Sequence, residues 1–418
     1  MQNNFSIRDD FILRYRRRDY NYNDIAQAVS YWLDQINQTT GTIGIAYATL
    51  SFSSIAFLLA LYKSNRPFTH LGVVGKEVSE QLLQDQKLGC IFVVGDLFHS
   101  NIKLDFISKQ LHHTDTWDHA YNCSKWTGSE ELVIPFTDAQ TINAFTSGST
   151  GNPSAVAMTS YIESLSISLA METFFIEDDY CVFAHGMSHM GVHTTAILPG
   201  LFKAKVVSLA DHTWDEEMVH ATHVQFFSTM SFLNLPKWLR VITTGGNSLK
   251  STFLEHIQSQ CQVDNIYDIY GLTECLPPLA VRSVQSLTDL NKPFTWINKD
   301  YQVDIQGDRI KITRPDDAVF VTSDRGSLNN NELTFLGRAL KLIRLYGNLV
   351  GVEEFKQTFE ASTKILDYVI EYNNNEFVLH ALEFDTEAVT LFVQLSNANV
   401  FVKYHKTLDT NGGIKNIS

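Results

Sequence analysis

The sequence predicts an α/β fold with a large N-terminal domain over residues 1–336 and a small α+β domain over residues 337–418. Three observations support this prediction. Short β-branched runs alternate with helical segments from Thr42 to Tyr270, which indicates mixed or parallel sheets flanked by helices. From Val303 onward, short alternating segments joined by turns indicate a β-rich subdomain. The chain has 418 residues, 44% of them hydrophobic, which is enough for two or three compact units.

The alternating pattern begins with a buried strand, which we expect at Thr42–Ala48 because apolar and β-branched residues follow one another there. The run Phe52–Tyr62 predicts a helix. Two further buried strands are expected at Leu71–Val74 and Cys90–Val94, with a polar helix at Lys76–Gln86 between them.

The same alternation resumes after residue 150. Helices are expected at Ser160–Phe175, His193–Phe202 and Ser248–Gln258. Strands are expected at Tyr180–Ala184, Lys205–Leu209, Val224–Phe227, Val241–Thr244 and Ile266–Tyr270. The β-rich part has candidate strands at Val303–Ile305, Arg309–Thr313, Val319–Thr322 and Glu332–Leu336. Beyond Gly337 come the segment Lys341–Leu345, a helix at Val352–Ala361, and strands near Asp367–Glu371, Glu376–Leu382 and Val389–Gln394.

Composition excludes several classes of function. The formal net charge of -14 disfavours nucleic acid as a main ligand, and the basic run Arg14–Arg18 lies among acids, so a solvated surface patch is the better interpretation. Five dispersed cysteines without CxxC spacing argue against a disulfide framework and a structural zinc site, and favour the cytoplasm. The polar segment Met1–Asp10 is no secretory signal, and the serine-containing stretch Tyr47–Tyr62 is too short for a membrane span.

A loop rich in hydroxyls and glycines follows a candidate strand at Ile142–Phe145. Glycines let a backbone approach a bulky anion, while hydroxyls and free N–H groups donate to phosphate oxygens. Taken alone, such a cluster is more often a plain loop. The candidate phosphate-binding residues are Thr146, Ser147, Gly148, Ser149, Thr150 and Gly151.

Three further clusters come later in the chain. The run Tyr270–Glu274 (YGLTE) ends a candidate strand, where ligands of open α/β sheets bind, and its Glu could hold Mg²⁺. The run Val321–Asp324 ends in a carboxylate that could accept both hydroxyls of a ribose. Gly337 and Arg338 form the last cluster. Each is weak in isolation, where a plain turn is the simpler interpretation.

Together these clusters resemble the adenylate-forming superfamily of acyl- and aryl-CoA synthetases, non-ribosomal peptide synthetase adenylation domains and luciferases. The segment Phe145–Val156 is similar to the family's phosphate loop, and Tyr270–Glu274 matches its YGxTE motif. The TGD element appears as Thr322-Ser323-Asp324. A GG element precedes YGxTE, and the hinge motif is matched by Gly337, Arg338, Ile343, Gly347 and Glu354. The resemblance covers about Thr42 to the C-terminus.

The resemblance implies ATP and Mg²⁺ as cofactors and a role for each matched residue. The loop would hold the β- and γ-phosphates, Thr273 the α-phosphate and Glu274 the Mg²⁺. The adenosine moiety would be bound by Gly245, Gly246, Asp268, Tyr270, Gly271, Asp324 and Arg338. Such enzymes pass the acyl group from AMP to the thiol of coenzyme A or of the phosphopantetheine on a carrier protein, and Gly347 would lie on the pantetheine path.

Three positions depart from the family pattern. The loop has Ser154 where a lysine is usual, and the hinge has Leu340 where Asp or Lys is usual. Near the C-terminus, Gly413 stands at the position of the lysine that polarises the reacting carboxylate, with Lys415 two residues further on. An extended tail would keep Lys415 on the same side as residue 413, so it is the candidate replacement. The region after Gly337 is also short for the family.

The substrate class follows from the segment Val182–Thr195, which contains no Asp or Glu to pair with an α-amino group. A small non-amino carboxylic acid, aliphatic or aryl, is therefore expected. The regularly spaced histidines of this segment could bind a metal if they lay on one face of a helix. Gly186 and Gly191 disfavour a regular helix, so a role in lining a pocket is the favoured interpretation. The candidate pocket residues are His189, Phe226, Gly246 and Leu276, although core packing would explain Phe226 and Leu276 equally well.

The leading hypothesis is an ATP-dependent acid–thiol ligase in the cytoplasm that acts on a small carboxylic acid with coenzyme A, or an acyl or peptidyl carrier protein, as acceptor. Its candidate catalytic residues are Thr273, Glu274 and Lys415. One alternative is a degenerate member that binds nucleotide or acyl ligand without adenylating it. Another is an enzyme that performs only the thiol-transfer half-reaction.

Overall fold

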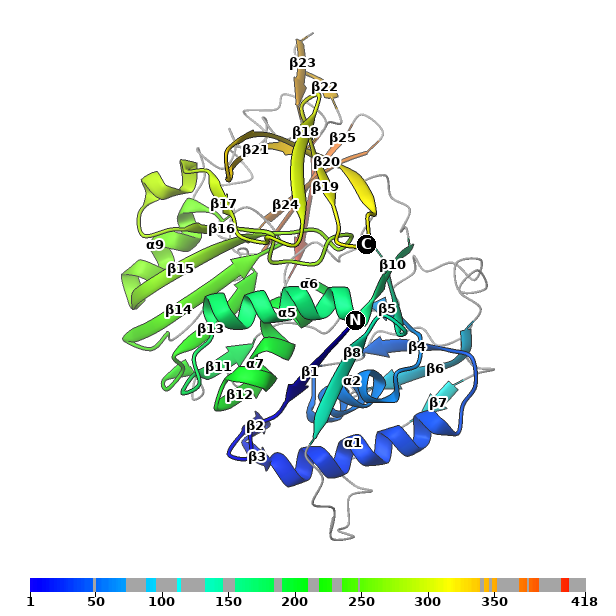
Figure 1. Cartoon of the computed structure of the whole chain (residues 1–418). Helices are drawn as coiled ribbons and strands as arrows, with labels where there is room; N and C mark the ends of the chain where they lie inside the picture. The colour runs from blue at the N-terminus through cyan, green and yellow to red at the C-terminus, as the bar shows by residue number, and fades with distance from the viewer. Residues whose placement is uncertain are drawn as a thin grey trace. The chain divides into compact units, whose positions relative to one another are not determined.

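The computed structural model describes two compact units, and each is considered by itself. Unit 1 comprises Met1–Gln225 and Gly271–Leu279, and unit 2 comprises Phe226–Tyr270 and Ala280–Ser418 (Figure 1). The residues described are 1–47, 50–72, 88–94, 111–113, 132–145, 155–183, 190–209, 218–227, 235–246, 249–338, 342–345, 348–351, 368–373, 376–382 and 400–405.

Unit 1 contains a mixed sheet that leads into the candidate phosphate loop. In sheet order its strands are β10 (Ala155–Thr159), β9 (Thr141–Phe145), β5 (Phe68–Gly72), β4 (Thr42–Tyr47), β6 (Leu88–Val94) and β7 (Leu111–His113). Neighbours run parallel except β10, which is antiparallel to β9. The strands predicted at Thr42–Ala48 and Cys90–Val94 are confirmed. The strand predicted at Leu71–Val74 begins at Phe68, because Phe68 and Thr69 already pair with β4.

A second group of paired strands in unit 1 includes the N-terminus of the chain, for which the sequence predicted no element. Its strands, in order, are β13 (His223–Phe227, whose last two residues belong to unit 2), β11 (Tyr180–Phe183), β12 (Val206–Leu209), β2 (Ile12–Tyr15) and β3 (Arg18–Asn21). Only the β2–β3 pair is antiparallel. Charged residues of the basic run hide the pattern, although Leu13, Tyr15 and Tyr20 are buried. Arg14 pairs with Asp19 at 2.6 Å, as suits a surface hairpin.

Two helices with capped N-termini pack together in unit 1. Helix α1 (Tyr22–Asn37) starts at a capping box formed by Asn21 and Asp24, and α2 (Phe52–Ser64) starts at one formed by Ser51 and Ser54. Trp32 of α1 meets Phe57 of α2 edge-on, with ring centroids 5.1 Å apart. The predicted helix Phe52–Tyr62 is confirmed, whereas α1 was missed.

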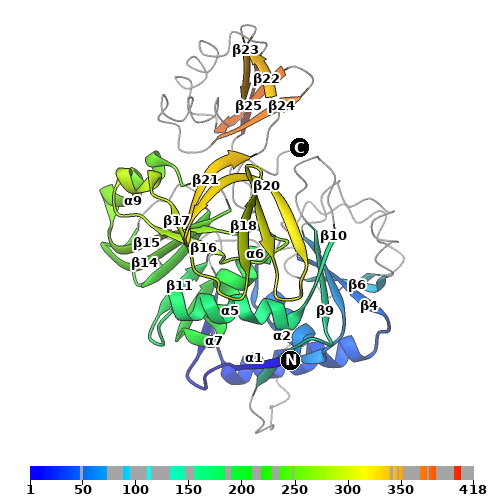
Figure 2. The ribbon, with the colours of Figure 1, turned by 45° about the horizontal axis from the view of Figure 1, so that its top comes forward.

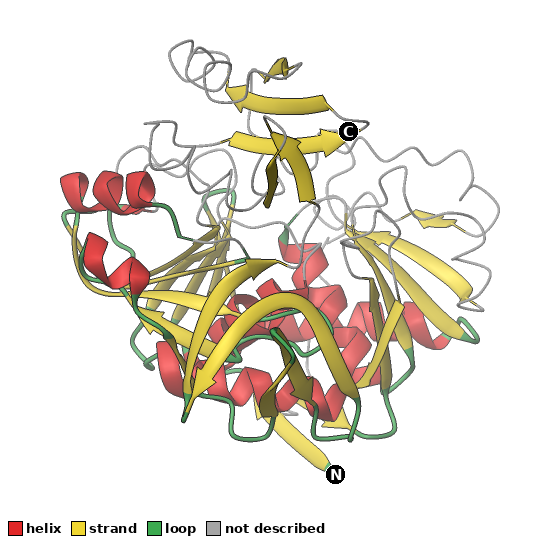
Figure 3. Ribbon diagram, turned by 90° about the horizontal axis from the view of Figure 1, so that it is seen from above, coloured by secondary structure: helices red, strands yellow, loops and turns green. Residues whose placement is uncertain are grey.

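The other helices of unit 1 come after the phosphate loop in the sequence; Figure 3 draws all described helices of the protein in red. Helix α5 (Ser160–Phe174) confirms the prediction at Ser160–Phe175. The helix predicted at His193–Phe202 is built from α6 (Met190–Val192), the π-helical η2 (His193–Ile197) and α7 (Leu198–Lys203). The Thr195 hydroxyl donates to the Gly191 carbonyl at 2.6 Å in this π-helical part. A two-stranded sheet of β1 (Gln2–Ser6) and β8 (Val133–Thr137) completes the elements of the described part of unit 1.

Unit 2 begins with a parallel βαβ unit. Strands β14 (Trp238–Gly245) and β15 (Gln262–Tyr270) are joined by α9 (Ser251–Gln260), which starts three residues later than predicted. Beyond β15 the sheet continues in antiparallel fashion. These strands are β16 (Ala280–Ser283), β17 (Phe294–Trp296), β21 (Glu332–Arg338), β20 (Val319–Asn329), β19 (Arg309–Thr313) and β18 (Gln302–Gln306), with a 3₁₀ turn η3 at Leu287–Asn291. The predicted β-rich subdomain is confirmed.

Strand β20 is long and visibly curved (Figure 2). Its pairing with β21 shifts register between Asp324 and Gly326, and such a bulge bends a strand and redirects side chains. Two smaller sheets follow in the described part of the C-terminal region. They consist of β22 (Leu342–Leu345) with β23 (Asn348–Gly351), and of β24 (Tyr368–Asn373), β25 (Glu376–Leu382) and β26 (Val400–His405).

Some predictions lie outside the described residues, namely the helices Lys76–Gln86 and Val352–Ala361 and the strand Val389–Gln394. The domain boundary at residues 336 and 337 stays a prediction. Among the helices that the structure describes, none combines the length and the apolar character that crossing a membrane requires.

Candidate functional site

A buried hydrogen bond joins two of the predicted site residues in unit 2. The Tyr270 hydroxyl donates to Oδ2 of Asp324 at 2.9 Å. Tyr270 is 8% exposed and Asp324 2% exposed, so the bond is shielded from water. Tyr270 ends β15 and Asp324 lies in β20, and the sheet therefore brings the second and third sequence clusters together.

The position of Asp324 is fixed by its own strand. The Thr322 hydroxyl accepts from the Asp324 amide at 3.0 Å and donates to the Asp324 carbonyl at 3.2 Å. The bulge ends at Gly326. A Cβ there would lie 2.9 Å from Ile310 Cγ1 and from the Thr334 carbonyl oxygen, so this position leaves no room for a side chain. Across the ladder, the backbone of Arg338 is the partner of Asp324. The carboxylate and the predicted arginine thus come from paired backbone positions.

Two glycines end the neighbouring strand β14. A Cβ on Gly245 would lie 3.0 Å from the carbonyl oxygen of Ile269, one residue before Tyr270, so the two strands approach closely here. Gly246 has φ 83°, a left-handed conformation that favours glycine. The GG element, Tyr270 and Asp324 therefore belong to a single unit of the structure.

Asp268 lies two residues before Tyr270, and its carboxylate is bound by an arginine that the sequence did not single out. Arg282 Nη2 donates to Asp268 Oδ2 at 2.5 Å, from the position directly opposite on β16. Burial raises the pKa of Asp268 to about 6, while the charge and the hydrogen bond of Arg282 oppose that rise. The predicted contact of Asp268 with an adenine amino group stays a prediction.

Arg282 also reaches other parts of unit 2. It donates to the carbonyl oxygens of Leu290 and Lys292, and its guanidinium lies 4.4 Å from the centre of the Phe294 ring. Phe294 in turn lies 6.1 Å from the ring of Tyr270. The only signal for Arg282 in the sequence was its separation from Asp268 along the chain, which suits two strands joined by a turn at YGLTE. Because the length of that turn was not known, the sequence could not show that the two residues are paired.

The turn Gly271–Leu279 belongs to unit 1 and carries Thr273 and Glu274, both half-buried. Its backbone is tied down: Ser166 donates to the Leu276 carbonyl at 3.0 Å, and Thr194 donates to the Pro277 carbonyl at 2.6 Å. Glu274 thus offers a carboxylate on a fixed turn at the end of a strand, and carboxylate oxygens are ligands that Mg²⁺ prefers.

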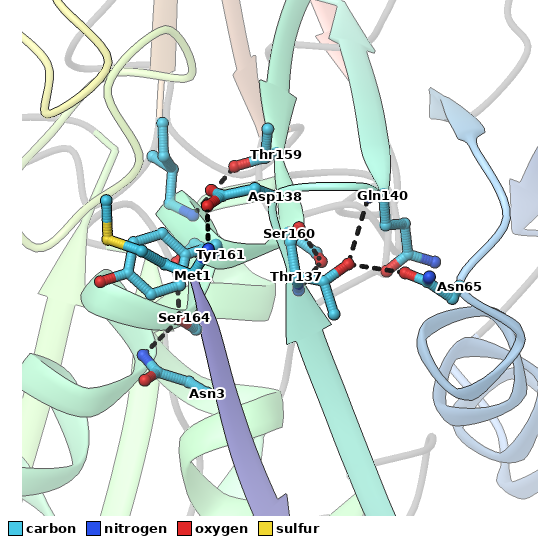
Figure 4. Close-up of polar contacts among 11 residues, drawn as sticks. Met1, Asn3, Asn65, Thr137, Asp138, Gln140, Thr159, Ser160, Tyr161 and Ser164 are labelled. Carbon is cyan, nitrogen blue, oxygen red and sulfur yellow. Dashed lines mark hydrogen bonds and ion pairs between the residues drawn. The ribbon is translucent and has the colours of Figure 1, made fainter.

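The candidate phosphate loop is flanked by the β9–β10 hairpin, whose base is closed by polar contacts (Figure 4). The Ser160 amide donates to the Gln140 carbonyl at 2.9 Å, and the Ser160 hydroxyl accepts from the Thr137 amide at 2.8 Å. The Thr137 hydroxyl donates to Asn65 at 2.6 Å. The last paired residues are Phe145 and Ala155, so the two strand ends that carry the loop lie side by side.

Several predicted site residues lie outside the described residues. These are Thr146, Ser147, Gly148, Ser149, Thr150, Gly151, His189 and Lys415. Two other predicted pocket residues are described, and both are buried. Leu276 lies in unit 1, and Phe226 lies in unit 2, where its ring centre is 6.3 Å from that of Phe253. Their predicted role as pocket walls stays a prediction.

Comparison with known families and structures tests the resemblance. The family model described as "AMP-binding enzyme" matches residues 130–315. The predicted resemblance to the adenylate-forming superfamily is confirmed. The matched range includes the phosphate loop, the GG element, Tyr270 and the turn with Thr273 and Glu274, but it ends before Asp324. A comparison with curated proteins finds no match.

Solved structures of this superfamily share the fold along nearly the whole chain. E. coli MenE with bound OSB-AMS has a TM-score of 0.70 at 15% identity, covering 96% of this chain and 94% of the other. O-succinylbenzoate coenzyme A synthetase (MenE) from Bacillus subtilis, in complex with ATP and magnesium, has a TM-score of 0.69 at 16% identity, covering 97% and 96%. The anthranilate CoA ligase AuaEII in complex with anthranoyl-AMP has a TM-score of 0.68 at 11% identity, covering 97% and 92%. The TM-scores show a shared fold in spite of these low identities.

Proposed function

We propose that this protein activates a small non-amino carboxylic acid with ATP, forming an acyl adenylate, and then transfers the acyl group to a thiol. The observation that carries the proposal is the buried Tyr270–Asp324 pair beside the GG element, in a chain that matches the AMP-binding enzyme family. A carboxylate can accept hydrogen bonds from both hydroxyls of a ribose, and a purine can pack against a flat surface of the protein.

The adenosine would bind within unit 2. Asp324 would accept from the ribose hydroxyls, while Gly245 and Gly246 would let the purine approach the backbone at the ends of β14 and β15. The hydrogen bond from Tyr270 holds one carboxylate oxygen of Asp324 in place, so the acceptor is oriented before the nucleotide arrives. Arg338, opposite Asp324 on β21, would add a positive charge near the ribose and phosphate.

The phosphates and the acid would be handled by residues of unit 1. The hydroxyls and amides of the loop Thr146–Gly151 would donate to the β- and γ-phosphates, and Thr273 to the α-phosphate. Mg²⁺, held by Glu274, would supply charge neutralisation where an anionic carboxylate attacks an anionic phosphate. The released products of this step are pyrophosphate and the acyl adenylate.

The proposed substrate class rests on the sequence and on two relatives. The stretch Val182–Thr195 offers no carboxylate for an α-amino group. Two enzymes with the same fold are an o-succinylbenzoate coenzyme A synthetase and an anthranilate CoA ligase, so aryl acids head the panel to test. The acceptor would be coenzyme A or a carrier-bound phosphopantetheine, reached by movement of the domain 337–418 about a hinge at Gly337.

Pyrophosphate exchange with ATP, measured against a panel of aryl and aliphatic acids, tests the proposal. Acid-dependent exchange is the expected result. ATP binding in calorimetry without exchange for any acid would contradict it and would favour a nucleotide-binding protein.

A second candidate function has a specific observation in its favour. Ser154 and Gly413 stand where the family has lysines, and Gly413 replaces the lysine that acts in adenylation. An enzyme limited to thiol transfer would consume a synthetic acyl adenylate with coenzyme A, yet give no exchange with the free acid. Comparing both reactions in the wild type and in Lys415→Ala separates the candidates: loss of exchange alone in the variant would assign adenylation to Lys415.

A further inference from the structure

Three side chains of types that bind metals meet in unit 1, away from the proposed nucleotide site in the sequence. Asp179 Oδ, Cys181 Sγ and His223 ring nitrogen atoms all lie within 4.8 Å of one another. All three residues are 0% exposed. The proposed activity uses none of them.

The sheet geometry explains why they meet. Cys181 of β11 and His223 of β13 are direct partners in the parallel ladder, so their side chains emerge on the same face. Asp179 precedes Cys181 by two residues, the spacing that keeps two side chains on one face of an extended chain. The cluster is thus built by register across two strands separated by 42 positions in sequence, and not by a local motif.

Hydrogen bonds hold the aspartate in this cluster. Oδ1 of Asp179 accepts from the Thr222 hydroxyl at 3.1 Å, and Oδ2 accepts from the Ile176 amide at 2.9 Å. The Thr222 amide donates to the Tyr180 carbonyl at 2.8 Å, so the residue just before His223 is fixed as well. Hydrogen-bonded outer groups of this kind orient metal ligands.

Apolar groups close the face around the cluster. The ring of Phe175 lies 4.5 Å from that of His223, and Phe183, two residues after Cys181, lies 6.4 Å from it. Helix α7 covers the same face, since a Cβ on Gly200 would lie 2.8 Å from the Phe183 ring and 3.1 Å from Val207. The cluster therefore sits in a largely apolar part of the core.

We propose that Asp179, Cys181 and His223 bind a zinc ion that cross-links β11 and β13. A thiolate and a carboxylate together offset the two positive charges of Zn²⁺, and a neutral imidazole adds none, which suits a buried site. Ligand atoms on a tetrahedral zinc are roughly 3.3–3.7 Å apart, so the side chains need to close by about 1 Å. Three protein ligands leave one position for a water molecule.

The dispersed cysteines argued against a zinc site in the sequence, because structural sites are recognised by short CxxC spacing. A set of three different ligands brought together by strand register has no such spacing. Zinc bound here would stabilise the folded chain by mass action, since the separated strands of the unfolded chain offer no preformed site.

Metal analysis of the purified full-length protein tests the inference. We expect about one zinc per chain by mass spectrometry, and, after chelation and refolding with Co²⁺ under reducing conditions, a thiolate-to-cobalt charge-transfer band. The variants Cys181→Ser and His223→Gln should lose the metal and the band. The control Cys261→Ser removes another buried thiol, located in unit 2, and should keep both.

The melting temperature supplies a second measurement. Zinc should raise that of the wild type and of Cys261→Ser, and leave those of Cys181→Ser and His223→Gln unchanged. Wild-type protein that holds no stoichiometric metal after purification and after refolding with zinc overturns the proposal, and identifies the cluster as a hydrogen-bonded core triad. Metal retained in Cys181→Ser overturns it too, because the ion would then sit elsewhere. Neither measurement depends on the adenylating activity.

Discussion

The hydroxyl of Tyr270 and the carboxylate of Asp324 form a 2.9 Å hydrogen bond between residues 54 positions apart in sequence. The bond links the end of a parallel strand to the bulge of a curved antiparallel one. A buried carboxylate loses hydration, and a fixed donor offsets part of that cost. The pair therefore couples the stability of unit 2 to the orientation of the proposed ribose acceptor.

Removing the hydroxyl with Tyr270→Phe tests the structural side of this coupling. The ring contacts remain, but a buried oxygen of Asp324 loses its donor, so the free energy of unfolding should fall by about 1–3 kcal/mol in urea titrations. The control Tyr31→Phe changes a tyrosine that is 38% exposed and should stay within about 0.5 kcal/mol of wild type. Equal effects of the two substitutions would argue against a stabilising bond.

The variant Asp324→Ala tests the binding side. If the carboxylate accepts from the ribose, affinity for ATP should fall by about 10- to 100-fold in calorimetry, the value of hydrogen bonds to a charged group. Wild type should also prefer ATP to 2′,3′-dideoxy-ATP, and the variant should not. The control Asp308→Ala removes an exposed carboxylate that pairs with Arg325 at 2.7 Å, and should bind ATP as wild type does. Undiminished preference for the ribose hydroxyls in Asp324→Ala would exclude the assigned role.

The sequence predicted much of the fold because apolar periodicity marks elements that are buried. The strand at Thr42 and the helix at Phe52 are rich in apolar residues, and both were located within two residues. The N-terminal hairpin was missed because Arg14, Arg18 and Asp19 mask the alternation of the buried Leu13, Tyr15 and Tyr20. Where charged side chains occupy the exposed positions of an edge hairpin, the sequence shows no clear hydrophobic periodicity of either a helix or a strand.

The candidate site was predictable only where its residues form local motifs. Gly245, Tyr270 and Asp324 were recognised from short runs of sequence, whereas Arg282 was not, because its partner Asp268 is set by the register of β15 and β16. The same limit applies to Asp179, Cys181 and His223. Contacts made across strands depend on loop lengths and pairing, and a single sequence does not specify either.

Asp268 predicts a distinctive pH dependence of stability. Burial raises its pKa to about 6, above the ordinary value of 3.8, so the folded state binds the proton more tightly than the unfolded state. The stabilising contribution is complete below about pH 4 and is lost as the pH rises to about 6, by up to roughly 3 kcal/mol. Urea titrations from pH 4 to 7 should show a shallower decline for Asp268→Asn than for wild type. The exposed control Asp300→Asn should keep the wild-type profile, and parallel profiles for wild type and Asp268→Asn would refute the assignment.

Glu163 predicts a second and wider window. It is fully buried in α5, and burial raises its pKa to about 8, although the Tyr62 hydroxyl, which donates to Oε2 at 2.6 Å, lowers it in part. Its contribution is complete below about pH 4.5 and declines until about pH 8, beyond the window of Asp268. Replacement by the neutral isostere in Glu163→Gln should remove the decline between pH 6 and 8. The control Glu172→Gln lies on the exposed side of the same helix and should retain it.

The turn that carries Thr273 and Glu274 depends on a glycine. A Cβ on Gly271 would lie 2.3 Å from Pro277 Cβ and 2.9 Å from Pro277 Cα, and no side-chain rotation can relieve contacts with atoms this close to the backbone. Gly271→Ala should therefore displace the turn, lower stability by about 1–3 kcal/mol and abolish acid-dependent pyrophosphate exchange. Gly307→Ala is the matched control: its φ of +69° imposes left-handed strain, but no atom lies within 4 Å of the added Cβ. It should cost about 1 kcal/mol and leave exchange intact. If the two variants exchange equally well, the geometry of the Gly271–Leu279 turn does not set the activity, and Thr273 and Glu274 lose their assigned roles.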